Sequence, residues 1–337
     1  MAQRESALGK NRRLIIHNLL DDEARNSLAE DVRAGLSATP KFLLPKYFYD
    51  ELGSILFDAI CLLPEYYLTR AEDEILTRYA NEIVASITGH KTLLEFGSGS
   101  ATKTRRIIET ILDQQRELLF MPIDISPSAL EASAKQLLQT YPSLSVEAYA
   151  GDYFTGLKTL SKTPRTSERI LALFLGSNIG NFDPEEAQKF LSALRLCLRA
   201  GDALLLGADL KKNKTILEEA YDDPLGLTAV FNLNQLARIN RELDANFDLR
   251  SFSHHAFYNE EIGRVEIYIE SLRKQTVAIR KLNLSVEFKK GEMVHTENSY
   301  KYDLEDLSGL ASETGFERTR TWVDHGRMFT SNLFLAV

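Results

Sequence analysis

The stretch that most constrains the fold is T-L-L-E-F-G-S-G-S-A-T-K at residues 92–103. A short apolar run leads to Glu95, and two glycines follow at Gly97 and Gly99. The next segment, 105–112, has the apolar spacing that is typical of a helix. Glycine has no Cβ and tolerates positive φ, so a glycine-rich turn that opens a helix brings backbone N–H groups close to a ligand. The pattern predicts a strand, a ligand-binding turn and a helix.

Strand and helix patterns alternate from this turn as far as residue 209. Continuously apolar runs such as I-L-A-L-F-L and A-L-L-L-G-A are typical of strands that are buried on both faces of a parallel sheet. Strands that alternate with helices build βαβ units, so we expect a doubly wound α/β sheet. The further strands are expected at 118–125, 144–150, 169–176 and 203–208, and the helices between them at 102–115, 127–140 and 184–198.

The flanking parts of the chain have a different rhythm. A polar helix is expected at 18–37, and period-2 alternation such as R-V-E-I-Y-I-E-S appears between 249 and 288. That alternation predicts antiparallel strands in a separate α+β element. We therefore expect a discontinuous layout, in which one domain contains the parallel sheet and the remaining segments form a second lobe. The sheet domain is expected at 72–209 and 303–337, and the lobe at 13–71 and 210–302.

Polar side chains are found where the predicted strands end. Ligands bind at the carboxyl ends of strands in an open parallel sheet, so these side chains are candidates for one site. An acid at the second strand end, Asp124, suits a ribose, since one carboxylate can accept hydrogen bonds from both hydroxyls. Asp152, followed by Tyr153, suits an adenine, with the carboxylate for the exocyclic amine and a backbone N–H for a ring nitrogen. The set also contains Glu95, Asn181 and Asp209.

Two nucleotide ligands compete for the glycine turn. A dinucleotide would favour G-x-G-x-x-G, but Thr102 stands where the third glycine would be, and no G-x-x-x-x-G-K-[ST] motif occurs. S-adenosylmethionine has no phosphates and needs a turn that admits its methionine part, together with acids for the ribose and the adenine. The combination of E-x-G-x-G with Asp124 and Asp152 favours S-adenosylmethionine.

Five motifs, in the same order along residues 40–337, resemble the histidine-specific N-alpha-methyltransferase family of ergothioneine biosynthesis. They are P-E-Y-Y-x-T-R (64–70), E-F-G-S-G-S-A-T-K-T-R (95–105), G-S-N-I-G-N-F (176–182), E-A-Y-D-D-P-x-G-x-T-A-x-F-N-L-N (219–234) and T-E-N-S-Y-K-Y (296–302). The resemblance implies a class I, Rossmann-like methyltransferase domain with an added substrate-binding lobe. It also implies trimethylation of the α-amine of L-histidine to hercynine by S-adenosylmethionine. The cofactor residues that it implies are Gly97, Lys103, Asp124, Asp152 and Tyr153.

The same resemblance implies a set of substrate residues. Asn181 and Tyr221 would hold the amine and the carboxylate at the reacting end, and Glu297 and Ser299 would contact the imidazole. One tyrosine of the pair 66 and 67 would add a hydroxyl; we favour Tyr66, with Tyr49 as a weaker candidate. The chain departs from the pattern near Ile267, where relatives are expected to have a methionine. This departure weakens the prediction of strict histidine selectivity more than the prediction of methyl transfer.

The chemistry that these residues must supply is limited. Methyl transfer is an in-line displacement at a sulfonium carbon that the cofactor has already activated, so the protein contributes position and electrostatics. Asn181 is neutral and can hold the amine without retaining a proton, and the amine can lose its proton to water between transfers. No dedicated base is required.

Two alternatives to histidine methylation remain open. One is methylation of another amine, such as tryptophan, a dipeptide or a histidine in a protein tail; Glu297 disfavours tryptophan, because a carboxylate buried opposite an indole is poorly satisfied. The other is a catalytically inactive protein that binds S-adenosylmethionine, which would most simply show as loss of Asn181 or Tyr221, and both are present.

Composition limits the partners. A net charge of −8 over 337 residues argues against a nucleic-acid binder. No apolar run approaches the ~18 residues of a membrane span, and the polar N-terminus lacks the apolar core of a signal peptide. Cys61 and Cys197 lie too far apart to indicate a disulfide scaffold, so a cytoplasmic location is the default. We expect a small-molecule substrate.

Metal binding is not expected either. His254 and His255 are adjacent on a predicted strand, so their side chains point to opposite faces. The other four histidines, His17, His90, His295 and His325, do not have the spacing of metal ligands.

Overall fold

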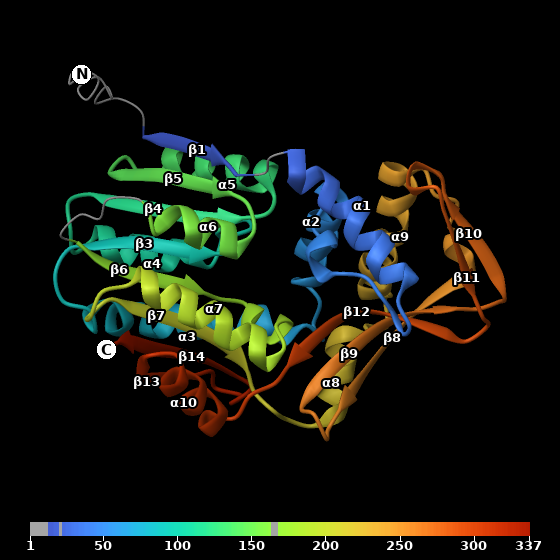
Figure 1. Ribbon diagram of the computed structural model, residues 1–337. Coiled ribbons are helices and arrows are strands. Elements are labelled where there is room, and N and C mark those ends of the chain that lie inside the picture. Colours follow the sequence, from blue (N-terminus) through green and yellow to red (C-terminus); the bar gives the residue numbers. More distant parts are fainter. Residues whose placement is uncertain (1–12, 20–21, 163–167) are drawn as a thin grey trace, which may run out of the picture.

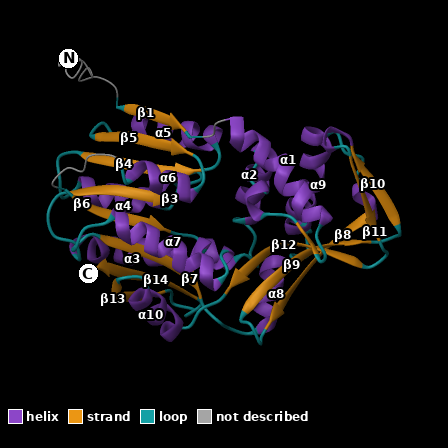
Figure 2. Ribbon diagram, in the orientation of Figure 1, coloured by secondary structure: helices purple, strands orange, loops and turns teal. Residues whose placement is uncertain are grey.

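The computed structural model describes residues 13–19, 22–162 and 168–337. These residues form two lobes, one built on an eight-stranded sheet and one on a smaller four-stranded sheet (Figure 1). Figure 2 shows that helices flank both sheets. The sequence predicts that the N-terminal segment is not a signal peptide. Most of that segment lies outside the described residues. In the described part of the chain, no helix combines the length and the apolar character that crossing a membrane requires.

The large sheet has the strand order β1-β5-β4-β3-β6-β7-β14-β13. All pairs from β1 to β7 are parallel, whereas β14 runs antiparallel to β7 and forms a hairpin with β13. The expected α/β sheet is thereby confirmed. Its strands are β1 (Leu14–Asn18), β3 (Lys91–Phe96), β4 (Leu118–Asp124), β5 (Leu144–Ala150), β6 (Arg169–Phe174), β7 (Ala203–Asp209), β13 (Phe316–Val323) and β14 (Phe329–Ala336).

Two separate apolar cores cover the two faces of this sheet, as expected for strands such as β7 that are buried along their whole length. One core is formed with α3 (Tyr67–Ala85), α4 (Thr104–Leu112) and α5 (Pro127–Thr140). The other is formed with α6 (Tyr153–Leu160), α7 (Pro184–Cys197) and α10 (Leu304–Glu313). The helix starts follow local chemistry: Asp183 forms a capping box with Glu186 at the start of α7.

The smaller lobe has a four-stranded sheet in the order β2-β12-β9-β8 and a two-stranded sheet, β10-β11. A third apolar core joins these strands to α1 and α9. The lobe contains α1 (Asp22–Ser37), β2 (Lys41–Phe42), α2 (Glu51–Ile60), α8 (Lys214–Tyr221), α9 (Leu227–Leu243), β8 (Phe252–Asn259), β9 (Arg264–Ser271), β10 (Gln275–Ile279), β11 (Leu284–Phe288) and β12 (Glu292–Tyr300).

The edge strand β1 differs from the sequence expectation. Residues 13–71 were expected to lie in the lobe, with a helix from residue 18, but Leu14–Asn18 pairs in parallel with β5 and extends the large sheet. The run L-I-I-H-N does not alternate between apolar and polar residues, so its pattern does not predict a half-buried strand. The rest of the division stays a proposal, with 72–209 and 303–337 in the sheet domain and the chain from α1 to residue 71 with 210–302 in the lobe.

A β-bulge in β12 determines which side chains face the large lobe. The register of β12 on β9 shifts between His295 and Glu297, so Thr296 is the extra residue. Before the bulge Val294 pairs with the inward-facing Ile269, and after it Glu297 pairs with the inward-facing Ile267. The bulge therefore changes the inward-facing positions of β12 from even to odd numbers. As a result, the inward face carries 297 and 299 and continues to 301.

Candidate active site

A cavity lies between the two lobes, beyond the carboxyl ends of β6 and β7, and its empty volume including the open part is about 600 Å³. Its wall is formed by the loop after β6, the segments that precede α2 and α3, the second half of α2, the facing ends of α8 and α9, and the inward faces of β9 and β12. All six side chains that the sequence analysis assigned to the substrate line it: Tyr66, Asn181, Tyr221, Ile267, Glu297 and Ser299.

Aromatic rings form one side of this cavity. Tyr66 packs edge-on against Tyr221, with ring centroids 6.1 Å apart, and Phe57 packs edge-on against Tyr66 at 6.0 Å. Tyr49, the weaker candidate, also lines the cavity. Tyr67 lies outside the lining, because its hydroxyl points to Asp209 instead. Of the adjacent tyrosines, it is therefore Tyr66 that faces the cavity.

Tyr221 and Ser299 are joined at the cavity wall. Their hydroxyl oxygens lie 2.8 Å apart, and Lys301 Nζ donates to both, at 2.8 Å each. Lys301 follows Ser299 by two residues and therefore lies on the same face of the chain. Sequence reasoning missed Lys301, although its period-2 spacing from Glu297 was a signal that could have identified it.

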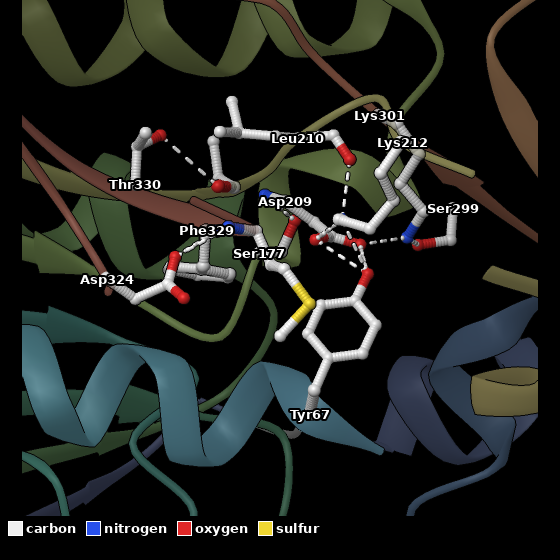
Figure 3. Close-up of polar contacts among 12 residues, drawn as sticks. Tyr67, Ser177, Asp209, Leu210, Lys212, Ser299, Lys301, Asp324, Phe329 and Thr330 are labelled. Atoms are coloured by element: carbon white, nitrogen blue, oxygen red, sulfur yellow. Dashed lines mark hydrogen bonds and ion pairs between the residues drawn. The ribbon is translucent and has the colours of Figure 1, made fainter. Parts of the chain in front are cut away.

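Asp209, at the end of β7, is the centre of this polar network (Figure 3). Its carboxylate pairs with Lys301 Nζ at 2.9 Å, accepts the Tyr67 hydroxyl at 2.8 and 2.9 Å, and pairs with Lys212 Nζ at 2.5 Å. The side chains of Asp209 and Lys301 are fully buried. Burial lowers the pKa of the Lys301 ammonium, but the charge of Asp209 and the contacts with Tyr221 together raise this pKa above its usual value, so Lys301 stays protonated.

Glu297 is an acid on the same inward face of β12 as Ser299, two residues earlier along the strand. Burial raises the pKa of its carboxyl to about 7, and the positive charge of Lys301 opposes that rise. Its charge therefore changes in the neutral range. A carboxylate in this position can accept an N–H from an occupant of the cavity.

Asn181 reaches the cavity from the short 3₁₀ helix Asn178–Asn181 after β6. The two residues that lead into this helix, Gly176 and Ser177, both have left-handed backbone conformations, with φ of 72° and 59°. Ser177 is held there because its Oγ accepts the backbone N–H of Asp209 at 2.9 Å. A non-glycine residue in this conformation is uncommon and often marks a functional loop.

The residues that were assigned to the cofactor lie around the glycine turn and the adjacent strand ends. Gly97 has φ of 71°, and a Cβ there would lie 2.7 Å from Tyr153 Oη and 2.8 Å from Asn178 Nδ2. Asp124 is bound to the same turn, since it accepts the Gly99 N–H at 2.9 Å. The glycine at 97 is therefore required by both conformation and space.

Asp152 and Lys103 already have protein partners. Asp152 caps α6 by accepting the Thr155 N–H at 2.9 Å and the Thr155 hydroxyl at 2.6 Å. A carboxylate has about four acceptor sites, so capacity for an amine remains. Lys103 pairs with the buried Glu72, which places its ammonium beside the loop at Gly176.

Glu95, in the E-x-G-x-G motif, is buried at the end of β3. Its Oε1 accepts the Thr104 hydroxyl at 2.5 Å, whereas its Oε2 has no partner among the described residues. Burial raises the pKa of the Glu95 carboxyl to about 8, so this acid is largely neutral at pH 7.

Asn232, on α9, is a cavity residue that sequence reasoning missed. Its Nδ2 donates to the carbonyl of Tyr268 at 3.0 Å and lies 2.9 Å from His254 Nδ1. The other ring nitrogen of His254 lies 2.8 Å from the Tyr221 carbonyl, and burial lowers the pKa of this histidine, so Nδ1 is an acceptor. The amide orientation is therefore determined, and its Oδ1 is buried without a partner among the described residues.

The comparisons with known proteins agree with one another. A family model described as histidine-specific, S-adenosylmethionine-dependent methyltransferase matches residues 28–336. A histidine N-alpha-methyltransferase of Mycolicibacterium smegmatis is 42% identical over 91% of this chain and 94% of that protein. One of Mycobacterium tuberculosis is 41% identical over 95% of this chain and 98% of that protein. An L-tryptophan methyltransferase of Psilocybe serbica is 27% identical over 82% of this chain and 83% of that protein.

Proposed function

The chain belongs to the family of histidine-specific, S-adenosylmethionine-dependent methyltransferases, and on this basis we propose that it methylates the α-amine of L-histidine. Three successive transfers give hercynine, a step of ergothioneine biosynthesis. The observation that supports this best is the single cavity that contains Asn181, Tyr221, Glu297 and Ser299 at the strand ends beside the glycine turn. These groups complement an amine, a carboxylate and a ring with an N–H.

We propose that S-adenosylmethionine lies along the carboxyl ends of β3, β4 and β5. The ribose hydroxyls meet Asp124, whose carboxylate also accepts the Gly99 N–H. The adenine meets Asp152 and Tyr153, and Lys103 holds the carboxylate of the methionine part. Gly97 leaves space for the cofactor because no Cβ projects from the turn. When bound, the cofactor supplies an activated methyl group.

The protein's own contribution is alignment of the amine with that methyl group. Asn181 accepts an amine N–H through its carbonyl and offers its NH₂ to the α-carboxylate, while Tyr221 holds the same end of the amino acid. Glu297 accepts the ring N–H at the other end, with Ser299 beside it. Between transfers the amine loses its proton to water. Holding the reacting atoms in line accounts for the acceleration without a dedicated base.

The proposed reaction involves neither a metal ion nor a macromolecular partner. The sulfonium carries its own activation, so the proposed reaction requires no metal, and no group of three or more His, Cys, Asp or Glu that could hold one is found in the described ranges. The proposed substrate is a free amino acid and not a nucleic acid or a membrane component. The cytoplasmic location expected from the sequence stays a prediction.

Tryptophan methylation is the alternative to be tested, because a tryptophan methyltransferase is among the relatives at 27% identity. The test is incubation with labelled S-adenosylmethionine and each of the twenty amino acids. Label in histidine, with masses increased by one, two and three methyl groups, is expected. The substrate assignment fails if another amino acid is labelled and histidine is not. If the protein binds S-adenosylmethionine but labels no amino acid, the result supports the alternative of a catalytically inactive binding protein.

The assignment of Glu297 is tested separately by titration calorimetry. Glu297→Ala is expected to weaken histidine binding at least tenfold, because it removes the acceptor for the ring N–H. Its affinity for S-adenosylmethionine should not change, since Glu297 lies on β12 and away from the glycine turn. Equal loss of both affinities would refute the ring contact.

A further inference from the structure

The three N–H groups of Lys301 are all used inside the protein. Nζ lies 2.8 Å from Tyr221 Oη, 2.8 Å from Ser299 Oγ and 2.9 Å from Asp209 Oδ2. An ammonium has three donors and no acceptor, so these contacts exhaust it. The side chain is fully buried, and Figure 3 shows it between Asp209 and Ser299. Lys301 therefore acts on an occupant of the cavity only through the two hydroxyls.

The hydrogen bonds of this pair can be counted. Each hydroxyl has one proton and two lone pairs, and Lys301 takes one lone pair on each oxygen. The 2.8 Å contact between Tyr221 and Ser299 uses one of the two protons and one more lone pair. A phenol is the stronger acid, so Tyr221 donates to Ser299. Both lone pairs of Ser299 are then occupied, and its proton is free for the cavity.

We propose that Lys301 is a positioning residue that makes Ser299 a donor-only contact, so that the cavity accepts the substrate ring as neutral imidazole. This inference rests on the proposed function, because it takes L-histidine as the occupant. Neutral imidazole has one N–H and one bare nitrogen, which match Glu297 as acceptor and Ser299 as donor. The lone pair that remains on Tyr221 suits an N–H of the α-amine.

The same arrangement discriminates against other rings. An imidazolium would bring a second N–H against the Ser299 proton and a positive charge toward Lys301. An indole has one N–H and no bare nitrogen, so the Ser299 proton would remain without an acceptor. A buried polar group left unpaired in this way weakens binding about five- to 150-fold, which is enough for selection between ligands.

Several charged or titratable groups surround the hydroxyl pair and must be separated in any test. Glu297 is on β12 and Lys301 directly follows its last residue, and Asp209 and Lys212 lie at and after the end of β7. Tyrosine rings approach from the start of α3 and from the segment before α2. Protonation of Glu297 weakens binding of any ring that donates an N–H. The pH dependence of KM is therefore measured for two substrates, and the ratio of the two KM values is compared.

The first experiment uses the wild-type enzyme with L-histidine and with 1,2,4-triazole-3-alanine. The triazole has an N–H and bare nitrogens, but it is a far weaker base than imidazole, whose pKa is about 6.5. The KM for histidine, divided by that for the triazole, is expected to rise about fivefold from pH 6.5 to pH 5.5, because the neutral fraction of an imidazole with that pKa falls by this factor. A constant ratio, or one that falls, overturns the inference. It would show that the site accepts imidazolium.

The second experiment removes the Lys301 ammonium, which donates to the hydroxyls of Tyr221 and Ser299. Asp209→Asn with Lys301→Met deletes both members of the ion pair, so neither is left buried without the other. Lys212 loses the charge of Asp209 but keeps the carbonyl of Leu210 as an acceptor at 2.6 Å. The KM for histidine is expected to rise at least tenfold with a smaller change in kcat, and the pH dependence of the ratio should disappear. S-adenosylmethionine binding should persist and confirms that the variant is folded.

The matched control is Lys41→Met with Glu292→Gln, which removes an ion pair between β2 and the first residue of β12, at the end of β12 remote from the cavity. Its KM and pH ratio should equal those of the wild type. If the Asp209/Lys301 variant behaves like this control, the inference is wrong. If the wild type yields no methylated histidine, the proposed function itself fails. Because the wild-type ratio needs no variant, the test stands even if the double variant does not fold.

Discussion

Both carboxylate oxygens of Glu72 lie 2.9 Å from the backbone nitrogen of Gly176. This contact joins α3 to the loop after β6, where the backbone turns left-handed, and Glu72 also pairs with Lys103. The side chain of Glu72 is fully buried. One carboxylate therefore fixes a wall residue of the substrate cavity and a proposed cofactor residue at the same time.

Replacement of Glu72 should affect the cofactor more than the substrate. Glu72→Gln keeps the acceptor for the Gly176 N–H but removes the charge opposite Lys103. We expect at least fivefold weaker S-adenosylmethionine binding and a loss of about 1–3 kcal/mol in stability, measured by calorimetry and thermal unfolding. Glu82→Gln changes an exposed acid on the same helix and serves as the control. Unchanged cofactor affinity in the Glu72 variant would contradict the proposed role of Lys103.

Gly97→Ala should abolish cofactor binding by crowding the turn. The new Cβ would lie within 3 Å of Tyr153 Oη and Asn178 Nδ2, so those side chains must move. We expect at least a tenfold loss of S-adenosylmethionine affinity by titration. Gly89→Ala is the control, because Gly89 also has positive φ but a Cβ there meets no atom within 4 Å. Both variants carry backbone strain, but only Gly97→Ala crowds the turn that follows β3.

Glu297 should make the stability of the ligand-free protein depend on pH. Its carboxyl pKa is raised from 4.5 to about 7, so between these values the folded state binds the proton more tightly than the unfolded state. Stability from this group is therefore present at low pH and is lost as pH rises toward 7. Glu297→Gln should unfold at a higher temperature than wild type at pH 8 and at the same temperature near pH 4. A difference that does not vary with pH would contradict the raised pKa.

Asn232→Ala should weaken histidine binding, because Asn232 Oδ1 is a buried acceptor on the cavity wall without a partner among the described residues. We expect a five- to tenfold rise in the KM for histidine, with no change in S-adenosylmethionine affinity. Asn234→Ala is closely matched: Asn234 is on the same helix, and its amide donates to Asp50 at 2.9 Å, away from the cavity. A similar KM in both variants would assign Asn232 to stability alone.

Much of the large sheet could be predicted because its signals are local. The continuously apolar runs and the helix starts at Asp183 and Ser126 produce the same structure regardless of distant contacts. The smaller lobe was predicted less completely. Its antiparallel strands alternate visibly, but the bulge at Thr296 leaves no trace in the pattern, since a one-residue shift depends on the pairing with β9.

The candidate site residues were predicted through motifs, and their partners were not. Tyr66, Asn181, Tyr221 and Glu297 all line one cavity, and their roles there stay a proposal. By contrast, a lysine in an alternating strand is usually solvated. The period-2 spacing from Glu297 could place Lys301 on the cavity face, but it does not mark Lys301 as a buried partner of Asp209.

Local sequence determined the alternation of strands and helices, the glycine at position 97 and the type of cofactor that the turn admits, because periodicity and positive φ are properties of a few adjacent residues. The tertiary structure decided which side chains lie next to one another in the wall of the cavity. Lys301 meets Asp209, 92 positions earlier in the printed sequence, only after β12 has been shifted by its bulge and placed against the end of β7. The direction of the hydrogen bond between Tyr221 and Ser299 depends on this contact of Lys301 with Asp209, so no single segment of the chain determines it.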